Sequence, residues 1–286
     1  MGMCDLTWPN TDIALAAAAA DHDIPVCLST FGSSSIEDIG KRASGNGWFQ
    51  LYVGPSIDDA MGLVQRAEDA GYEYLLLTVD VPVVSARLRE QRQGFERPFR
   101  MRPRQFLDFA VHPQWVLHTL VNGVPKPANV VPTGNEGNKP TFTRNEIRGH
   151  IDWQFLDRLR ERWAGKLILK GVLSADDAVR IRDAGADAVY VSNHGGRQLD
   201  AAPAAIDVLP AIRQAVGADY PLIFDSGIRS GEGIVKALAL GADFVMLGRP
   251  FLYASGADGQ RGVYRLVELL KNDLLLVLAQ IGCIDV

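Results

Sequence analysis

Residues 191–200 carry side chains suited to acid–base chemistry. They read Val191-Ser-Asn-His-Gly-Gly-Arg-Gln-Leu-Asp200 and directly follow the apolar run Ala188–Val191. An imidazole can take up a proton near neutral pH, and a guanidinium can hold a carboxylate through two parallel hydrogen bonds. His194 and Arg197 therefore suit a small acid that gives up a proton, and Gly195 and Gly196 let a flat ligand approach closely. The plainer interpretation is a polar turn, in which Asn and Gly are common.

Charged residues also end several apolar runs. Asp80, Lys170 and Asp225 each close such a run, and Arg249 directly follows another. A parallel barrel points the carboxyl ends of all its strands at one mouth. Because unpaired buried charges are costly, these side chains are expected to meet one another or a ligand there. Ordinary buried ion pairs are the alternative.

Short apolar runs alternate with helical stretches, which predicts a parallel sheet with crossover helices. Three helices end alike, at Ala70-Gly71, Ala184-Gly185-Ala-Asp187 and Leu240-Gly241-Ala-Asp243, where glycine closes the helix just before a strand. We expect an α/β fold, a (β/α)8 TIM barrel in a single domain over residues 1–286, with the first strand missing from this chain. The seven expected strands are Pro25–Ser29, Trp48–Val53, Tyr74–Val79, Lys166–Gly171, Ala188–Ser192, Leu222–Asp225 and Phe244–Gly248.

The loops after the last two strands suit a phosphate group. Loops in these positions of a barrel often hold phosphate with backbone amides and helix N-termini. Gly227 and Arg229 lie in the first loop, and Gly248 and Arg249 in the second. No Gly-x-Gly-x-x-Gly motif follows a strand, so no nicotinamide-dinucleotide site is expected.

Composition narrows the class of protein further. The chain has 286 residues and a net charge of −5, which gives no reason to expect a nucleic-acid partner. Three scattered cysteines suit neither a disulfide framework nor a metal site. No secretory signal or transmembrane run is visible, so a cytoplasmic location is expected.

These motifs together resemble the family of FMN-dependent α-hydroxy-acid oxidases and dehydrogenases, which includes glycolate oxidase, flavin-linked L-lactate dehydrogenase and mandelate dehydrogenase. The most specific match is residues 192–200. The other matches follow in family order and cover essentially the whole chain: Trp48–Val53, Leu77–Asp80, Leu169–Gly171, Asp225–Arg229 and Lys236–Asp243. The resemblance implies oxidation of a lactate- or mandelate-like L-2-hydroxy acid to the 2-oxo acid. It also implies FMN as cofactor, a quinone or oxygen as electron acceptor, and a homo-oligomer, usually a tetramer.

The same resemblance implies roles for individual residues. His194 would be the base, Asp80 would steady its imidazolium, and Tyr52 would hydrogen-bond the substrate hydroxyl. Arg197 and Arg87 would hold the substrate carboxylate. A fixed cation such as Lys170 beside flavin N1 and O2 stabilises the anion of the reduced ring. The full set of implied flavin contacts is Gly2, Ser29, Gln50, Thr78, Lys170, Ser192, Asp225, Gly227, Arg229, Gly248 and Arg249.

The beginning of the sequence departs from the family pattern. Met1-Gly2 falls where the family has a Pro-x-Gly or Pro-x-Ala turn beside flavin N5, and glycine in place of alanine resembles the dehydrogenase members, which react sluggishly with oxygen. The family's extra substrate-binding tyrosine and the first strand belong to an N-terminal segment that this sequence lacks. We therefore expect the chain by itself to bind FMN poorly or not at all.

Residues 88–150 form an irregular stretch that is too long for an ordinary connection. It is basic at first and then amphipathic and aromatic over residues 106–121. Such a segment can rest on an anionic membrane surface, and it resembles the segment of membrane-associated lactate and mandelate dehydrogenases at His112-Pro-Gln-Trp115. Peripheral contact through residues 88–121 with the inner face of the membrane is one interpretation. A lid or a subunit contact is the other.

Two other functions stay open at this point. Another FMN-binding barrel enzyme, such as a flavin-dependent isomerase, would share the phosphate loops but would not need the pair of His194 and Arg197. An incomplete barrel kept as an interaction module is supported only by the missing strand. The apolar C-terminal helix, Val263–Ile281, is expected to contribute a face to the core through Leu266, Leu269, Leu270 and Leu274.

Overall fold

The computed structural model describes residues 1–83, 85, 92–93, 103–130, 149 and 151–286. In these residues seven parallel strands form one sheet, in the order β1-β2-β3-β4-β5-β6-β7. They are β1 (Val26–Ser29), β2 (Gly47–Leu51), β3 (Tyr74–Thr78), β4 (Lys166–Val172), β5 (Ala188–Val191), β6 (Leu222–Phe224) and β7 (Phe244–Val245). Each coincides with an expected strand, apart from small differences at the ends, so the strand prediction is confirmed.

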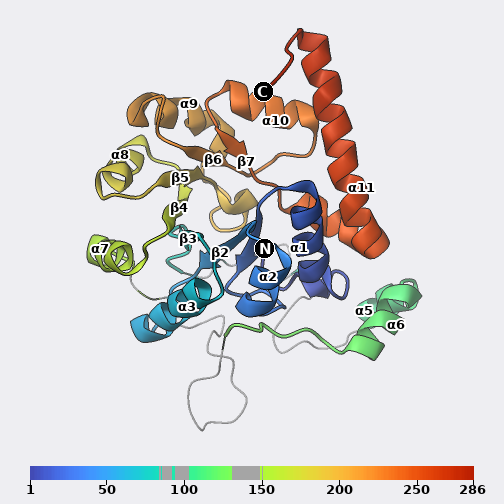
Figure 1. Ribbon diagram of the computed structural model, residues 1–286. Helices are drawn as coiled ribbons and strands as arrows, with labels where there is room; N and C mark the ends of the chain where they lie inside the picture. Colours follow the sequence, from blue (N-terminus) through green and yellow to red (C-terminus); the bar gives the residue numbers. More distant parts are fainter. Residues whose placement is uncertain (84, 86–91, 94–102, 131–148, 150) are drawn as a thin grey trace.

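Helices between the strands cover the outside of the sheet, which curls into an open barrel wall (Figure 1). The α/β barrel architecture expected from the sequence is therefore confirmed. The helices are α1 (Thr11–His22), α2 (Ile36–Arg42), α3 (Ile57–Asp69), α5 (Pro103–Ala110), α6 (Pro113–Asn122), α7 (Trp153–Arg162), α8 (Ala175–Asp183), α9 (Ala205–Val216), α10 (Gly231–Ala239) and α11 (Arg249–Ile281), with short 3-10 turns η1 (Cys4–Leu6) and η2 (His194–Gly196).

Side-chain caps start the outer helices at fixed points. The hydroxyl of Ser56 accepts a hydrogen bond from the backbone N–H of Asp59, and Ser174 does the same for Asp177. Each cap satisfies an amide that the first helical turn leaves unpaired. Each of these helices therefore starts at the same end of the sheet, shortly after the strand that precedes it.

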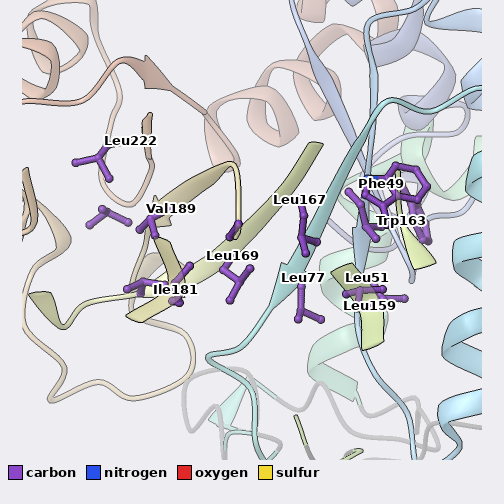
Figure 2. Close-up of a cluster of buried hydrophobic side chains, with 14 of the residues drawn as sticks. Phe49, Leu51, Leu77, Leu159, Trp163, Leu167, Leu169, Ile181, Val189 and Leu222 are labelled. Atoms are coloured by element: carbon purple, nitrogen blue, oxygen red, sulfur yellow. The ribbon is translucent and has the colours of Figure 1, made fainter. Parts of the chain in front are cut away.

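The strands alternate between two apolar layers. Leu75 and Leu77 face outward into the large core between sheet and helices, whereas Leu76 belongs to a smaller cluster on the inner face. This follows from the two-residue period of a strand. Figure 2 shows part of the outer core, in which Leu77, Leu167 and Leu169 from neighbouring strands lie among side chains of the helices.

The repeated Gly-Ala-Asp sequence fixes where two strands begin. Asp187 accepts a hydrogen bond from the backbone N–H of Leu167 on the adjacent strand and pairs with Arg160. Asp243 repeats the arrangement with the N–H of Leu222 and with Arg213. The aspartates thus lock the register of neighbouring strands at the end of the sheet opposite the charged residues.

The stretch expected to be irregular contains the helix pair α5 and α6, which lies to one side of the barrel (Figure 1). Two contacts tie this pair to the first residues of the chain. The indole N–H of Trp115 donates to the carbonyl oxygen of Leu6 at 3.1 Å, and the rings of Trp8 and His118 lie 4.5 Å apart. In the described part of the chain, no helix has both the length and the apolar character needed to span a bilayer.

The prediction for the C-terminal helix was wrong in one respect. Leu269 is 53% exposed, and Leu266, Leu270 and Leu274 are only half-buried. The core contacts of this part of α11 come instead from Val263 and Leu278, which are buried. A helical apolar period marks a face that can be covered, but it does not identify what covers it.

Candidate active site

A band of polar side chains crosses the carboxyl ends of the strands. Ser29 donates from its hydroxyl to Oε1 of Gln50 at 2.9 Å, and Nε2 of Gln50 donates to Oγ1 of Thr78 at 2.8 Å. All three are buried, with exposed fractions of 4%, 6% and 2%. The structure therefore brings these three predicted flavin contacts into one hydrogen-bonded row on β1, β2 and β3.

Lys170 and Asp225 continue the band on the next strands. Nζ of Lys170 donates to Oγ of Ser192 at 2.8 Å and lies 3.2 Å from Oδ2 of Asp225. Burial by itself would raise the pKa of Asp225, but the charge of Lys170, together with hydrogen bonds from three side-chain hydroxyls, holds the pKa of that carboxyl below its usual range. The hydroxyls belong to Ser192, Ser226 and Tyr190. Asp225 is thus a carboxylate at neutral pH.

Three predicted catalytic residues form a second chain of contacts. Nδ1 of His194 lies 3.1 Å from both carboxylate oxygens of Asp80, and Nε2 of His194 lies 3.2 Å from the hydroxyl oxygen of Tyr52. His194 and Asp80 are mostly buried, with side-chain exposures of 20% and 13%. Asp80 favours the tautomer that carries hydrogen on Nδ1, which leaves the lone pair of Nε2 as the basic site.

The backbone around His194 is held in an unusual conformation. His194 has φ +58°, and Gly195 and Gly196 follow with +68° and +73°. Side-chain oxygens satisfy the amides of this turn, because Ser192 accepts from the N–H of His194 and Ser226 accepts from the N–H of Gly195, at 3.0 and 3.1 Å. A non-glycine residue in the left-handed region is often found at functional sites. This turn aims the imidazole at Asp80.

The predicted phosphate loops meet the same turn. Nη2 of Arg249, in the first turn of α11, donates to the carbonyl oxygen of Gly195 at 2.9 Å. A Cβ atom on Gly195 would lie 2.7 Å from that guanidinium nitrogen, so a side chain there would shift the guanidinium from this position. Arg229 is exposed and donates to the carbonyl oxygen of Ile228. Gly227 has φ +109°, and Gly248 is the N-cap of α11.

The remaining predicted site residues are placed less directly. Gly2 packs on the polar band, because a Cβ atom there would lie 3.5 Å from Oγ of Ser29 and 2.9 Å from Cβ of Phe31. Arg197 is an exposed residue at the end of η2, three residues after His194. Arg87 lies outside the described residues. In the described ranges, no three His, Cys, Asp or Glu side chains are grouped as metal ligands.

Sequence reasoning missed two residues of this site. Ser226 accepts from two backbone amides of the His194 turn and donates to Asp225 at 2.7 Å. Tyr190 donates from its hydroxyl to Oδ2 of Asp225 at 3.0 Å. Ser226 follows Asp225 directly, so its position beside a predicted site residue was the available signal. Tyr190 gave no signal, because an aromatic residue in an apolar strand is ordinary.

This donor set fits FMN. Neutral hydroxyl and amide groups on β1 to β3 suit the polar edge of the flavin ring, and Lys170 supplies the cation expected near N1 and O2. Asp225 has the acceptor oxygens that ribityl hydroxyls need. Arg249 and the N-terminus of α11 offer positive charge for a phosphate.

The chain is similar to known FMN-dependent enzymes. The family model described as FMN-dependent dehydrogenase matches residues 1–286. The chain is 42% identical to (S)-mandelate dehydrogenase of Pseudomonas putida, over 100% of this chain and 72% of the relative, and 38% identical to L-lactate dehydrogenase of Pseudomonas syringae pv. syringae (strain B728a), over 99% and 75%.

Solved structures give the same picture. A structure described as the monotopic membrane protein (S)-mandelate dehydrogenase matches with a TM-score of 0.92 and 42% identity, over 99% of this chain and 76% of that one. A mandelate oxidase structure matches with a TM-score of 0.81 and 35% identity, over 99% and 73%. The chain thus spans about three quarters of the length of these proteins.

Proposed function

This chain belongs to the family of FMN-dependent dehydrogenases, and from that premise we propose that it oxidises an L-2-hydroxy acid of the mandelate or lactate type to the 2-oxo acid. The observation that carries the proposal is the chain of contacts from Tyr52 through His194 to Asp80. Family membership favours this function over a flavin-dependent isomerase and over a non-enzymatic fragment.

Each of the three residues has a separate role in the proposed reaction. The lone pair on Nε2 of His194 takes a proton from the substrate, and the carboxylate of Asp80 stabilises the imidazolium that results. The hydroxyl of Tyr52 lies beside Nε2 of the His194 imidazole, so the substrate would approach the imidazole from this side. The Tyr52 hydroxyl would then hydrogen-bond the substrate hydroxyl. FMN, when bound, accepts the two electrons that leave the substrate carbon.

Positive charges at the mouth of the barrel would hold three negative groups: the substrate carboxylate, the reduced flavin ring and the FMN phosphate. Arg197, and Arg87 in the part of the chain that is not described, would bind the substrate carboxylate through bidentate hydrogen bonds. Lys170 would face the polar edge of the flavin ring, where its ammonium stabilises the negative charge that reduction brings. Arg249 and Arg229 would lie at the phosphate.

Flavin bleaching without oxygen tests the proposal. The purified chain, loaded with FMN, is mixed anaerobically with (S)-mandelate or L-lactate, and the flavin absorbance is expected to disappear with at least one of them. His194→Ala should keep the yellow cofactor and lose the bleaching, whereas His112→Ala, at an exposed histidine of the α5–α6 segment, should bleach normally. Normal bleaching by His194→Ala would refute the role of His194, and flavin indifferent to both acids would refute the substrate class.

We also propose a quinone rather than oxygen as the electron acceptor. The support is Gly2, which packs against Ser29 and Phe31 and resembles the residue of the dehydrogenase members. The expected result is slow formation of hydrogen peroxide in air and fast turnover with an artificial quinone. Peroxide formed at the rate of substrate oxidation would contradict this assignment.

Peripheral contact with a membrane is proposed for the helix pair α5 and α6. Seven large apolar side chains of this segment are 62% to 77% exposed: Phe106, Leu107, Val111, Leu117, Leu120, Val121 and Val124. A cluster of this kind is typical of an interaction surface. One of the matched structures carries the description of a monotopic membrane protein, which supports a lipid surface as the occupant.

A homo-oligomer is proposed as well. Leu275 and Leu276 of α11 are 56% and 64% exposed, so this helix has an apolar face available to a second copy. Light scattering of the purified chain should give a mass of two or more copies of the 31.2 kDa chain, with a tetramer expected. A monomer at micromolar concentration would contradict the proposal.

A further inference from the structure

Tyr190 lies at the centre of the charged part of the polar band. It is in the middle of β5, belongs to the apolar cluster on the inner face of the sheet, and is only 3% exposed. Its hydroxyl donates to Oδ2 of Asp225 at 3.0 Å, and Nζ of Lys170 lies 4.6 Å from the centroid of its ring. One side chain therefore contacts both members of the Lys170–Asp225 pair.

We propose that Tyr190 is a positioning residue that controls how much of the positive charge of Lys170 reaches bound FMN. The inference rests on the proposed function, because it takes Lys170 and Asp225 as flavin contacts. The inference adds Tyr190 as a residue that affects flavin reduction through Lys170 and Asp225.

The carboxylate of Asp225 and bound FMN would compete for the charge of Lys170. Oδ2 of Asp225 lies 3.2 Å from Nζ of Lys170, close enough for the carboxylate to neutralise much of the field of the ammonium. The Tyr190 hydroxyl donates to that same oxygen, and Ser226 donates to Oδ1. Hydrogen bonds to a carboxylate spread and stabilise its charge, so Asp225 binds Lys170 less strongly than a carboxylate without these donors.

The ring and the hydroxyl have separate effects. The π face of the ring lies beside the ammonium of Lys170, whose side chain is only 14% exposed, so the two attract each other. Burial, and next the charge of Asp225, raises the pKa of Tyr190 well above its usual value, so the phenol stays protonated and remains a donor. A Tyr190→Phe variant keeps the ring and removes only the donor.

The affinity of the flavin for sulfite provides a readout other than turnover. Sulfite adds to N5 of oxidised flavin and leaves an anionic ring, so a cation near N1 and O2 strengthens its binding. Loss of the Tyr190 hydroxyl lets Asp225 hold Lys170 more tightly. In Tyr190→Phe loaded with FMN, the dissociation constant for sulfite should rise about tenfold and the midpoint potential of the flavin should fall. A hydrogen bond to a charged group changes an equilibrium constant by about tenfold or more, which sets the size of the expected effect.

Two further variants make the test specific. Tyr220 also donates its hydroxyl, in a half-buried position, to the carbonyl oxygen of Ala186 at 2.9 Å, so Tyr220→Phe loses a tyrosine hydrogen bond away from the polar band. It should leave sulfite affinity unchanged. In an Asp225→Asn background, removal of the Tyr190 hydroxyl should have little further effect, because the carboxylate through which it acts is gone.

The outcomes separate this inference from the proposed function. Unchanged sulfite affinity in Tyr190→Phe, or an equal change in Tyr220→Phe, would overturn the inference while the proposed function stands. A wild-type chain whose bound FMN is bleached by neither (S)-mandelate nor L-lactate would overturn the proposed function, whatever the sulfite result.

Discussion

A Cβ atom placed on Gly171 would lie 2.5 Å from both Cβ and Cγ of Asp80, so the two residues are in direct contact at the ends of β4 and β3. Gly171 has φ +102°, and the register of β4 with β5 shifts between Lys170 and Val172. This bulge leaves the space that the carboxylate of Asp80 occupies while it holds His194. Gly171 is therefore part of what positions the base.

Gly171→Ala should lower kcat about 100-fold, because the added methyl group must push Asp80 away from His194, and a displacement of about 1 Å in a catalytic group can cost that factor. Steady-state kinetics and circular dichroism check this. Gly185→Ala is the matched control, since Gly185 also has positive φ, +85°, but has no atom within 4 Å of its Cβ position. Equal losses in both variants would mean that backbone strain alone is responsible.

Lys170→Met should slow reduction of FMN by substrate about tenfold or more while substrate still binds, because the charge that stabilises the reduced ring is lost. Stopped-flow measurements of the reduction rate against substrate concentration separate the rate from the dissociation constant. Lys236→Met removes a lysine that pairs with Glu232 on the exposed face of α10 and serves as control. A higher dissociation constant with an unchanged limiting rate would assign Lys170 to substrate binding instead.

Stability at the start of the chain should depend on Asp5. Burial raises the pKa of the Asp5 carboxyl above its ordinary value of 3.8, and the nearby carboxylate of Asp12 adds to the effect. A raised pKa in the folded state means that the contribution of Asp5 to stability is present below pH 3.8 and is lost as pH rises through the folded-state value. Asp5→Asn should therefore have a higher thermal midpoint than wild type at pH 7, and the difference should vanish toward pH 3.5. Asn keeps an acceptor for the N–H of Asp12, which donates to Oδ1 of Asp5 at 3.1 Å. A difference that stays constant with pH would show that ionisation is not its cause.

Binding to lipid should depend on the exposed apolar side chains of α5 and α6. Phe106→Glu combined with Leu120→Glu should abolish co-sedimentation with vesicles that contain anionic lipid. The reason is that two apolar side chains that would enter the lipid are replaced by negative charges, which the anionic surface repels. Ile284→Glu changes a still more exposed apolar residue near the C-terminus and should bind as wild type does. If wild type itself stays in the supernatant at low salt, the segment has another role.

Much of the fold could be predicted from the sequence, because its signals are local. Short apolar runs bounded by glycine and aspartate predicted all seven strands, and their order in the sheet follows from the repeated βα unit. The prediction failed where the burial of an apolar face depends on residues that are distant in the sequence. The leucines of α11 have helical spacing, yet whether that face is covered depends on other parts of the molecule or on other chains.

The sequence by itself determined which chemical groups stand at the ends of the strands, since a strand's carboxyl end and the side chain that follows it are neighbours along the chain. Only the tertiary structure decided which of these groups meet. His194 and Asp80 are separated by 114 positions and His194 and Tyr52 by 142, and it is the curl of the parallel sheet that brings them to hydrogen-bond distance. The contacts of Tyr190 and Gly171 have no trace in the sequence for the same reason: which neighbour a side chain touches across strands is fixed by register and by the face of the sheet, and these exist only once the strands have paired.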